Sequence, residues 1–254
     1  MPMPARAVAI IPARLGSTRF PAKALADQTG KPLVVHVCEQ ANKAESIDRV
    51  IVATDSDEIR SAVESHGFEA VMTSIDHENG TSRLAEASQV LALDDDQLIV
   101  NVQGDEPEIE PAVIDAAGSA GAMISGVGAG TVVTRIYTDE DFRNPNIVKA
   151  VLGAQRGDAR SAMYFSRATV PFPRNSPSDP PFRHVGIYAY TVASIRAYLD
   201  LVPSATEQTE SLEQLRWLAH GYPILASIVE SAHSGIDTPE QYRAFVERHQ
   251  QKMT

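Results

Sequence analysis

Short apolar runs alternate with amphipathic stretches along the first half of the chain. The runs lie at residues 7–11, 50–54, 69–72 and 98–102. Their apolar residues mostly follow one another directly, which is typical of strands buried on both faces of a sheet. Between them, the stretches at 32–44, from 55 onward and at 81–93 predict helices, the second with an Asp side chain as its cap. This alternation predicts a parallel sheet with helices on both faces.

The second half of the chain follows a less regular pattern. Strands are predicted at 131–136, 148–152 and 185–190, and helices at 207–219 and 239–251. Five prolines between positions 171 and 181 exclude a helix there and predict a loop or an extended arm. The sequence has no internal repeat and no long linker. We therefore expect one α/β domain over 1–254, with a subregion inserted at about 130–200.

Composition and charge restrict the partners of the chain. Its 254 residues include 22 Lys and Arg against 33 Asp and Glu, a net charge of −11 that disfavours nucleic acids and anionic membranes. The single cysteine, Cys38, excludes an internal disulfide and indicates a reducing compartment. No signal-peptide pattern is present, and the longest uncharged run, 116–134, is too weakly apolar to span a membrane. A cytoplasmic location is expected.

The loop after the first strand concentrates positive charge on an otherwise acidic chain. Arg14, Arg19 and Lys23 lie within ten residues, beside Gly16, Ser17 and Thr18. Cations next to small residues suit a polyphosphate, because backbone N–H groups and charged side chains can share its oxygens. The loop does not have the Walker A spacing, and the alternative is a solvated surface loop. Its position favours the binding interpretation, since ligands of such sheets bind at the carboxyl ends of the strands.

Acidic residues offer a second kind of chemistry. Asp105 follows the fourth strand, and Asp237 precedes the last predicted helix. Carboxylates at such turns can hold Mg²⁺ together with phosphate oxygens, although either residue could instead cap a helix. The stretch at 76–83 matches no zinc signature, so contacts to a nucleobase are the better interpretation. The glycines at 126–130 lack the full dinucleotide-binding spacing and are set aside.

Further polar candidates lie in the second half. A period of two places His184, Gly186 and Tyr188 on one face of a strand, where a lone histidine is more often structural. Glu213 and Gln214 lie in a predicted helix and could simply be solvated. No Ser-His-Asp or Cys-His arrangement supports a covalent route, and Cys38 is expected to pack in the core.

Taken together, eight motifs in a fixed order resemble the sugar cytidylyltransferases, and among them the 3-deoxy-D-manno-octulosonate (Kdo) cytidylyltransferases. The resemblance spans about residues 7–248. The motifs are IIPARLGSTRFPAK at 10–23, DHENGTSRLAE at 76–86, VNVQGDEP at 100–107, NPNIVK at 144–149, YFSRAT at 164–169, HVGIY at 184–188, LEQLR at 212–216 and GIDTPE at 235–240. Each motif alone is modest, but all eight in register are specific.

The resemblance implies a fold, a reaction and partners. The fold would be a three-layer α/β nucleotide-diphospho-sugar transferase, Rossmann-like, with a mixed, mainly parallel sheet and a smaller dimerisation subregion. The anomeric hydroxyl of Kdo would attack the α-phosphorus of CTP with Mg²⁺ present, giving CMP-Kdo and pyrophosphate for lipopolysaccharide biosynthesis. The enzyme would be a homodimer.

The resemblance also implies roles for individual residues. Arg14 and Lys23 would be catalytic residues that contact the triphosphate, and Asp105 and Asp237 would be catalytic metal ligands. The nucleotide would further be bound by Gly80, Thr81, Arg83 and Gln103. The sugar acid would be bound by Gln103, Arg167, His184, Tyr188, Glu213 and Gln214.

Two departures and two alternatives accompany this interpretation. The segment 170–183 is short and rich in proline, and Phe172 stands where relatives commonly carry tryptophan. One alternative is a cytidylyltransferase for another sugar acid, such as 8-amino-Kdo or a sialic acid. The other is a binding protein without turnover, which the presence of both Asp105 and Asp237 disfavours.

Overall fold

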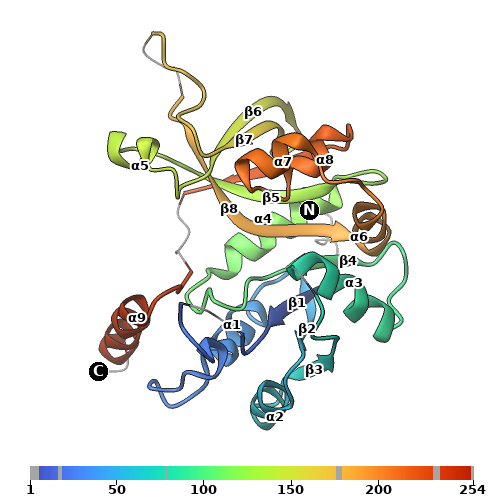
Figure 1. Cartoon of the computed structure of the whole chain (residues 1–254), viewed down its shortest axis with the longest axis vertical. Helices are drawn as coiled ribbons and strands as arrows, with labels where there is room; N and C mark the ends of the chain where they lie inside the picture. The colour runs from blue at the N-terminus through green and yellow to red at the C-terminus, as the bar shows by residue number, and fades with distance from the viewer. Residues whose placement is uncertain (1–5, 17–18, 78, 176–178, 231–234, 253–254) are drawn as a thin grey trace.

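A single sheet forms the middle layer of the structure, a computed structural model that describes residues 6–16, 19–77, 79–175, 179–230 and 235–252 (Figure 1). Its nine strands in this described part lie in the order β3-β2-β1-β4-β8-β5-β9-β7-β6. The strands are β1 (Ala7–Ala13), β2 (Ile47–Thr54), β3 (Glu69–Met72), β4 (Leu98–Asn101), β5 (Ala129–Arg135), β6 (Lys149–Arg156), β7 (Ala159–Ser166), β8 (Phe182–Thr191) and β9 (Ile224–Val229). Strands β7 and β8 run against the others, so the sheet is mixed and mainly parallel.

Helices cover both faces of this sheet, as the alternating pattern of the sequence predicts. They are η1 (Lys23–Leu25), α1 (Leu33–Ala41), α2 (Asp57–Ser65), α3 (Gly80–Val90), α4 (Pro111–Ala122), α5 (Asp139–Arg143), α6 (Val192–Leu199), α7 (Ala205–Glu210), α8 (Leu215–Ala219) and α9 (Pro239–Lys252). Helices α1, α2 and α4 share one hydrophobic core with the sheet, and α3, α6 and α8 share the other. This is the expected three-layer α/β fold.

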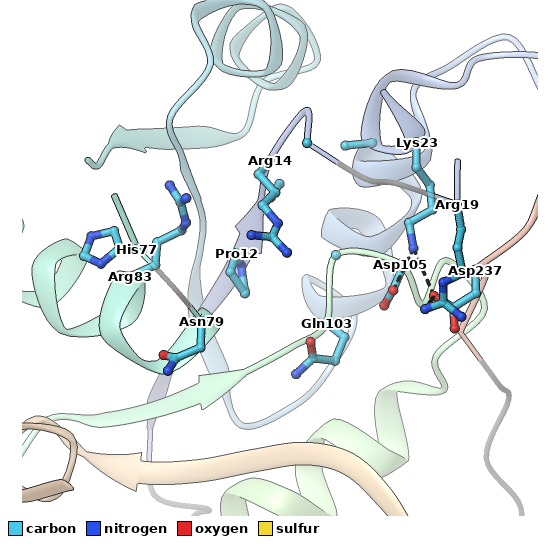
Figure 2. A pocket seen from close by; sticks show the side chains of 15 residues that line it. Pro12, Arg14, Arg19, Lys23, His77, Asn79, Arg83, Gln103, Asp105 and Asp237 are labelled. Atoms are coloured by element: carbon cyan, nitrogen blue, oxygen red, sulfur yellow. Dashed lines mark hydrogen bonds and ion pairs between the residues drawn. The ribbon is translucent and has the colours of Figure 1, made fainter. Parts of the chain in front are cut away.

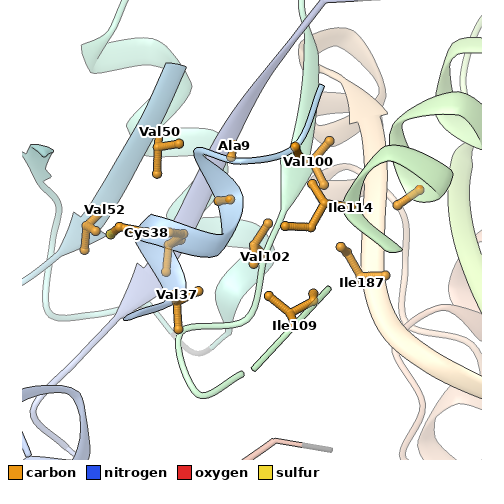
Figure 3. Close-up of a cluster of buried hydrophobic side chains, with 14 of the residues drawn as sticks. Ala9, Val37, Cys38, Val50, Val52, Val100, Val102, Ile109, Ile114 and Ile187 are labelled. Carbon is orange, nitrogen blue, oxygen red and sulfur yellow. The ribbon is translucent and has the colours of Figure 1, made fainter. Parts of the chain in front are cut away.

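The residues of β1 show why the first strands are apolar at nearly every position. Ala7, Ala9 and Ile11 belong to the core under α1, α2 and α4, which Figure 3 shows in part. Val8 and Ile10 belong to the core on the opposite face. Side chains of a strand alternate between faces, so a strand covered on both sides buries all of them. Cys38 of α1 is fully buried in the first core, as expected.

Strand β1 continues through Pro12 to Ala13, two residues beyond the apolar run at 7–11 that predicted it. Its pairing with β4 stops at Ile10, whereas its pairing with β2 continues to Ala13. Proline lacks an N–H, so it is tolerated where the strand has lost the partner on one side. The extension carries Ala13 and the loop that follows it to the edge of the sheet where ligands are expected.

Small side chains at 116–130 allow α4 to lie very close to the sheet. A side chain on Gly121 would start 2.7 Å from the Cβ of Ala189 in β8, and one on Gly130 would start 2.1 Å from the backbone nitrogen of Gly121. No larger residue fits at either position. The glycines at 126–130 therefore serve a turn and a close packing contact, in agreement with their rejection as a dinucleotide site.

Two local predictions were wrong, and some elements were missed. Helix α2 is capped by Ser56, whose hydroxyl accepts from the N–H of Ile59, and not by an aspartate. The single helix expected at 207–219 is two short helices, α7 and α8, because Ser211 between them adopts a left-handed φ of 52°. Strands β7 and β9 and helix α6 were not predicted.

Among the described helices, none combines the length and the apolar character needed to cross a membrane.

Candidate active site

A first pocket opens at the carboxyl ends of β1 and β4, where the three loops singled out in the sequence meet (Figure 2). Its lining residues are Pro12, Ala13, Arg14, Gly16, Arg19, Lys23, Ala24, His77, Asn79, Gly80, Arg83, Gln103, Gly104, Asp105 and Asp237. Gly104 permits this meeting, because a side chain there would start 2.7 Å from the carbonyl oxygen of Pro12. Ser17, Thr18 and Glu78, which belong to the same motifs, lie outside the described residues.

Lys23 joins the two aspartates that the sequence proposes as metal ligands. Its Nζ lies 2.8 Å from Asp105 Oδ2 and 3.6 Å from Asp237 Oδ1, and it donates to the carbonyl oxygen of Ile236 at 2.5 Å. The backbone N–H of Ile236 also donates to the carbonyl oxygen of Asp105 at 2.8 Å. These contacts bring together two loops that are separated by more than a hundred residues in the sequence.

The carboxylate of Asp237 is not used to cap α9. Thr238 accepts a hydrogen bond from the N–H of Gln241, and the Gln241 side chain accepts from the N–H groups of Asp237 and Thr238. This reciprocal arrangement is a capping box. Asp237 is thereby left to face Lys23 and Arg19, whose guanidinium lies 3.0 Å from Asp237 Oδ1. The capping alternative for Asp237 is wrong.

Arg14 is an exposed cation on this pocket that has no hydrogen-bond or ion-pair partner among the described residues. On the acidic side, burial and the neighbouring Asp105 raise the pKa of Glu106 to about 8. Glu106 therefore adds little negative charge at neutral pH. This end of the pocket presents three cations, Arg14, Arg19 and Lys23, against two carboxylates, Asp105 and Asp237, which suits an anion that brings a metal ion with it.

The opposite end of the first pocket is built from a buried ion pair. Arg83 donates to Asp55 at 2.7 Å and to the hydroxyl of Thr73 at 2.6 Å, and it is almost fully buried. Nearby, His77 contacts both Glu86 and Ser82. The hydrogen bond from the N–H of Ser74 and the His77 contact lower the pKa of Glu86. The loop at 73–83 is thus held by side chains on α3.

A second pocket adjoins the first and shares Gly80 and Gln103 with it. It lies between β8 and the segment that joins α7 to α8. Its lining residues are Gly80, Thr81, Asn101, Gln103, His184, Gly186, Tyr188, Tyr190, Tyr198, Ser211, Leu212, Glu213, Gln214 and Trp217. The pocket is rich in aromatic rings, and no Lys or Arg is among these described residues. The face of β8 predicted to carry His184, Gly186 and Tyr188 is the face that lines it.

His184 is held as a neutral imidazole in this wall. Desolvation by burial lowers its pKa to about 3. Its Nε2 lies 3.0 Å from the hydroxyl of Thr131, which donates its own hydrogen to the carbonyl oxygen of Ile187 at 2.7 Å. Nε2 must therefore be the protonated nitrogen, and Nδ1 is left as an acceptor.

Glu213 and Gln214 reach the second pocket because the helix is interrupted. The left-handed Ser211 ends α7 and lets residues 211–214 turn toward β8 before α8 begins. Burial raises the pKa of Glu213 and, more strongly, that of Tyr188. Both shifts favour the uncharged forms of groups that face the same space.

Arg167 is the one predicted sugar-acid residue that lines neither pocket. Its guanidinium donates to the carbonyl oxygens of Glu210, Pro145 and Ser211, at 2.9, 3.1 and 3.5 Å. Ser211 lines the second pocket, so Arg167 lies at its rim. The other predicted residues, in contrast, are gathered at the two pockets.

Comparison with known proteins gives this geometry a context. A family model described as cytidylyltransferase matches residues 8–228. The chain belongs to the cytidylyltransferase family. It is 46% identical over 243 residues to the 3-deoxy-manno-octulosonate cytidylyltransferases of Neisseria meningitidis serogroup B and Neisseria gonorrhoeae, covering 92% of this chain and 94% of each relative.

A solved structure supports the same placement in the cytidylyltransferase family. It is the CMP:2-keto-3-deoxy-manno-octonic acid synthetase complexed with CTP, which aligns with a TM-score of 0.89 at 36% identity. The alignment covers 98% of this chain and all of that one. The fold and the family resemblance stated from the motifs are both confirmed.

Several lining residues of this cytidylyltransferase escaped the sequence analysis. Tyr190 continues the period of two that selected Tyr188, so the same signal could have found it. Asn101 is the last residue of β4, two residues before Gln103. It lies in the motif at 100–107, but the sequence analysis predicted no role for it. Tyr198 and Trp217 carried no signal, because only the tertiary packing of α6 and α8 brings them to the pocket.

Proposed function

We propose that this chain transfers CMP from CTP to the anomeric hydroxyl of Kdo and releases pyrophosphate. The observation that carries the proposal is the pair of adjoining pockets: one rich in cations beside two carboxylates, the other lined by aromatic, hydroxyl and amide groups. A nucleotide triphosphate suits the first, and a polyhydroxylated sugar acid suits the second. Relatives that are 46% identical to this chain, over 94% of their own length, are named 3-deoxy-manno-octulosonate cytidylyltransferases.

The first pocket would bind the triphosphate and stabilise the charge that builds up on it. Arg14 has no competing partner among the described residues and is available to phosphate oxygens, while Lys23 is fixed by Asp105 and the Ile236 carbonyl. Charged donors aimed at a phosphoryl group stabilise a transition state in which charge moves toward the leaving pyrophosphate. Arg83, held by Asp55 and Thr73, would contribute to the wall beside the cytosine.

The residues present fit a magnesium ion. Mg²⁺ takes one or two protein carboxylates and completes its shell with water and substrate phosphates. Asp105 and Asp237, which both face the Lys23 ammonium, would supply those carboxylates, although no group of three His, Cys, Asp or Glu side chains gathers in the described part of the chain. When bound, the ion would neutralise phosphate charge and favour ionisation of an attacking hydroxyl.

The second pocket would orient the sugar acid. Gln103 lies at the boundary of the two pockets, and its amide donates to the carbonyl of Gly186 at 3.1 Å, which fixes its position. His184 offers a neutral acceptor, and Tyr188 offers a phenol that stays protonated because burial raises its pKa. Holding the acceptor hydroxyl near the α-phosphate is itself a large part of catalysis for a reaction between two bound anions.

The direct test is pyrophosphate release across a panel of nucleotides and sugar acids, with and without EDTA. We expect release only when CTP, Kdo and Mg²⁺ are all present. Turnover of 8-amino-Kdo or a sialic acid without turnover of Kdo would overturn the substrate assignment. Binding of CTP without turnover of any acid would overturn the activity. The alternative sugar acids are not favoured, since the relatives above are named for Kdo.

We also propose that the enzyme works as a homodimer in the cytoplasm. The subregion at 130–200 exposes large apolar side chains, among them Tyr137 at 76%, Met163 at 63% and Phe172 at 81%. Such residues are costly to leave in water unless a partner covers them. Light scattering should give twice the mass of the chain, and a Phe172→Asp variant should shift the mass toward that of the monomer.

A further inference from the structure

The floor of the second pocket holds polar atoms that lack partners. These are the amide oxygen Oδ1 of Asn101, the hydroxyl of Tyr190 and the amide nitrogen Nε2 of Gln214, none of which has a hydrogen-bond partner in the described part of the chain. The three residues are only 5%, 4% and 7% exposed. All three line the same pocket. Of the three, only Gln214 has a role implied by the family resemblance.

Such atoms are rare in folded proteins because they are expensive. A buried donor or acceptor without a partner has lost its hydrogen bonds to water and gained none in return, so nearly all such atoms pair with protein, water or ligand. Other polar groups of this pocket are paired, as the Thr131–His184 and Gln103–Gly186 hydrogen bonds show. The three groups without partners, here called the corner, line one substrate pocket, which points to a ligand group that pairs with them.

The sheet fixes the positions of Asn101 and Tyr190, the two residues of the three for which the resemblance implies no role. Asn101 is the last residue of β4, and Tyr190 lies on the neighbouring strand β8, where Ile99 pairs with Tyr190 and Asn101 pairs with Tyr188. Asn101 and Thr81 lie close enough to the Tyr190 hydroxyl to oppose the rise of its pKa, which burial causes. Groups carried on paired strands hold their positions better than groups on loops, which suits a specificity element.

The chemistry of the corner selects a neutral group. The lining residues of the second pocket include no Lys or Arg among those described, so a carboxylate would find no counter-ion there. A sugar hydroxyl, in contrast, both donates one hydrogen bond and accepts others. An amide oxygen, a phenol and an amide nitrogen together offer it an acceptor, a donor or acceptor, and a donor.

We propose that Asn101 and Tyr190, with Gln214, bind a hydroxyl group on the carbon chain of the sugar acid. This inference rests on the proposed function and adds two specificity residues to it. The corner recognises a non-reacting hydroxyl, at a distance from the anionic end of the substrate. A sugar acid that lacks this hydroxyl leaves three buried polar atoms unpaired and is discriminated against for that reason.

The test is steady-state kinetics with Tyr190→Phe, which removes one oxygen and keeps the ring. We expect kcat/KM for Kdo to fall about tenfold or more, because one hydrogen bond in a buried site is lost. The KM for CTP should not change. The Tm should stay the same or rise, because an unsatisfied buried hydroxyl has been removed. Asn101→Leu, which keeps the volume and removes the amide, should show the same kinetic pattern.

Tyr242→Phe is the matched control. Its hydroxyl accepts a hydrogen bond from the N–H of Gln28 at 2.8 Å, far from the second pocket in the contact between α9 and the loop before α1. Removing that oxygen takes away the partner of this N–H in a partly buried contact, so the Tm should fall while kcat/KM for Kdo is retained. The two variants thus separate a substrate contact from a structural hydrogen bond.

Kdo analogues that each lack one hydroxyl identify the group. One analogue should lose more on the wild-type enzyme than Tyr190→Phe loses on Kdo, because all three contacts to the hydroxyl are gone. Tyr190→Phe should cost much less with that analogue than with Kdo, since the oxygen that Tyr190 contacts is already absent. Unchanged Kdo kinetics in Tyr190→Phe, or a fall in Tm with equal losses for Kdo and CTP, would overturn the inference. A wild-type enzyme that does not turn over Kdo would overturn the proposed function itself.

Discussion

The two pockets differ in how their polar groups are partnered. At the Lys23 end of the first, cations and carboxylates are at least partly exposed and mostly paired with one another, as Lys23 is with Asp105 and Asp237. In the second, polar groups are buried among aromatic rings, and several have no partner among the described residues. Exposed charges cost little when the site is empty, since water solvates them, whereas buried polar groups need a specific ligand.

This difference matches the two proposed substrates. CTP carries several negative charges that any suitably placed cation can neutralise, so its pocket can be open and built on loops. Kdo differs from other sugar acids mainly in the number and placement of neutral groups. Discrimination among such compounds requires buried hydrogen-bonding groups on rigid elements, and β4 and β8 supply them. The first pocket thus provides charge, and the second provides selectivity.

The largest expected effect is on the carboxylates of the first pocket. Asp105→Asn should lower kcat by about a thousandfold or more, because a metal ligand and a partner of Lys23 are lost together. Its side chain is one-third exposed, so the Tm should change little. Pyrophosphate release and thermal unfolding measure the two effects. Asp57→Asn on α2, an exposed residue that lines neither pocket, is the control. Near-normal activity in Asp105→Asn would remove it from the metal site.

At the buried end of the first pocket, a substitution in the Arg83–Asp55 pair should lower stability as well as activity. Asp55→Ala leaves Arg83 charged and almost fully buried, which should cost about 3 kcal/mol of unfolding free energy and raise the KM for CTP. Urea unfolding and steady-state kinetics test this. Glu69→Gln removes the partner of Arg49 in an exposed pair, and its cost should stay within about 1 kcal/mol. Equal losses in the two variants would mean that the Arg83–Asp55 pair is as weak as a surface pair.

The contrast also explains how much could be predicted from the sequence. The basic loop was found because Arg14, Arg19 and Lys23 are close together in the sequence. Strands β1, β2 and β4 were found because they are buried on both faces. The separation of Asp237 from a capping role could not be predicted, because it depends on Thr238 and Gln241 making the cap. Lys23 bridging to Asp237 is likewise a tertiary contact.

The second pocket was less predictable for physical reasons. Its wall depends on β8 running antiparallel between β4 and β5, and on the left-handed Ser211 that interrupts a helical pattern. Neither feature leaves a clear local signal, since serine ordinarily avoids positive φ. The family resemblance supplied His184, Glu213 and Gln214, but the unpartnered Asn101 and Tyr190 became visible only through burial in the folded chain.

A smaller effect is expected for the free cation of the first pocket. Arg14→Ala should lower kcat/KM for CTP by about a hundredfold, because a charged donor to the triphosphate is lost. The Tm should not change, since Arg14 has no partner in the described part of the chain. Arg60→Ala, at a partly exposed position on α2 that lines neither pocket, should leave both quantities unaltered. A clear fall in the Tm of Arg14→Ala would show that the side chain has a structural role instead.

The smallest effect tests the desolvation that sets the second pocket apart. His184 has a pKa of about 3 in the fold, against about 6.5 when unfolded, so between these values only the unfolded chain takes up the proton. The unfolding free energy should therefore decline by about 1.4 kcal/mol per unit as the pH falls below 6.5, and His36, with a pKa of about 4, adds a similar decline. Urea unfolding at pH 6 and 5 gives the change of unfolding free energy with pH. In His184→Gln this change should be smaller than in the wild type by about 1.4 kcal/mol per pH unit.

His66→Gln, at an exposed position, is the control and should keep the wild-type dependence of the unfolding free energy on pH. If the unfolding free energy of His184→Gln depends on pH as that of the wild type does, water reaches the imidazole well enough for it to be protonated in the folded chain. The polar groups of the two pockets would then differ less in desolvation than their hydrogen-bond partners indicate.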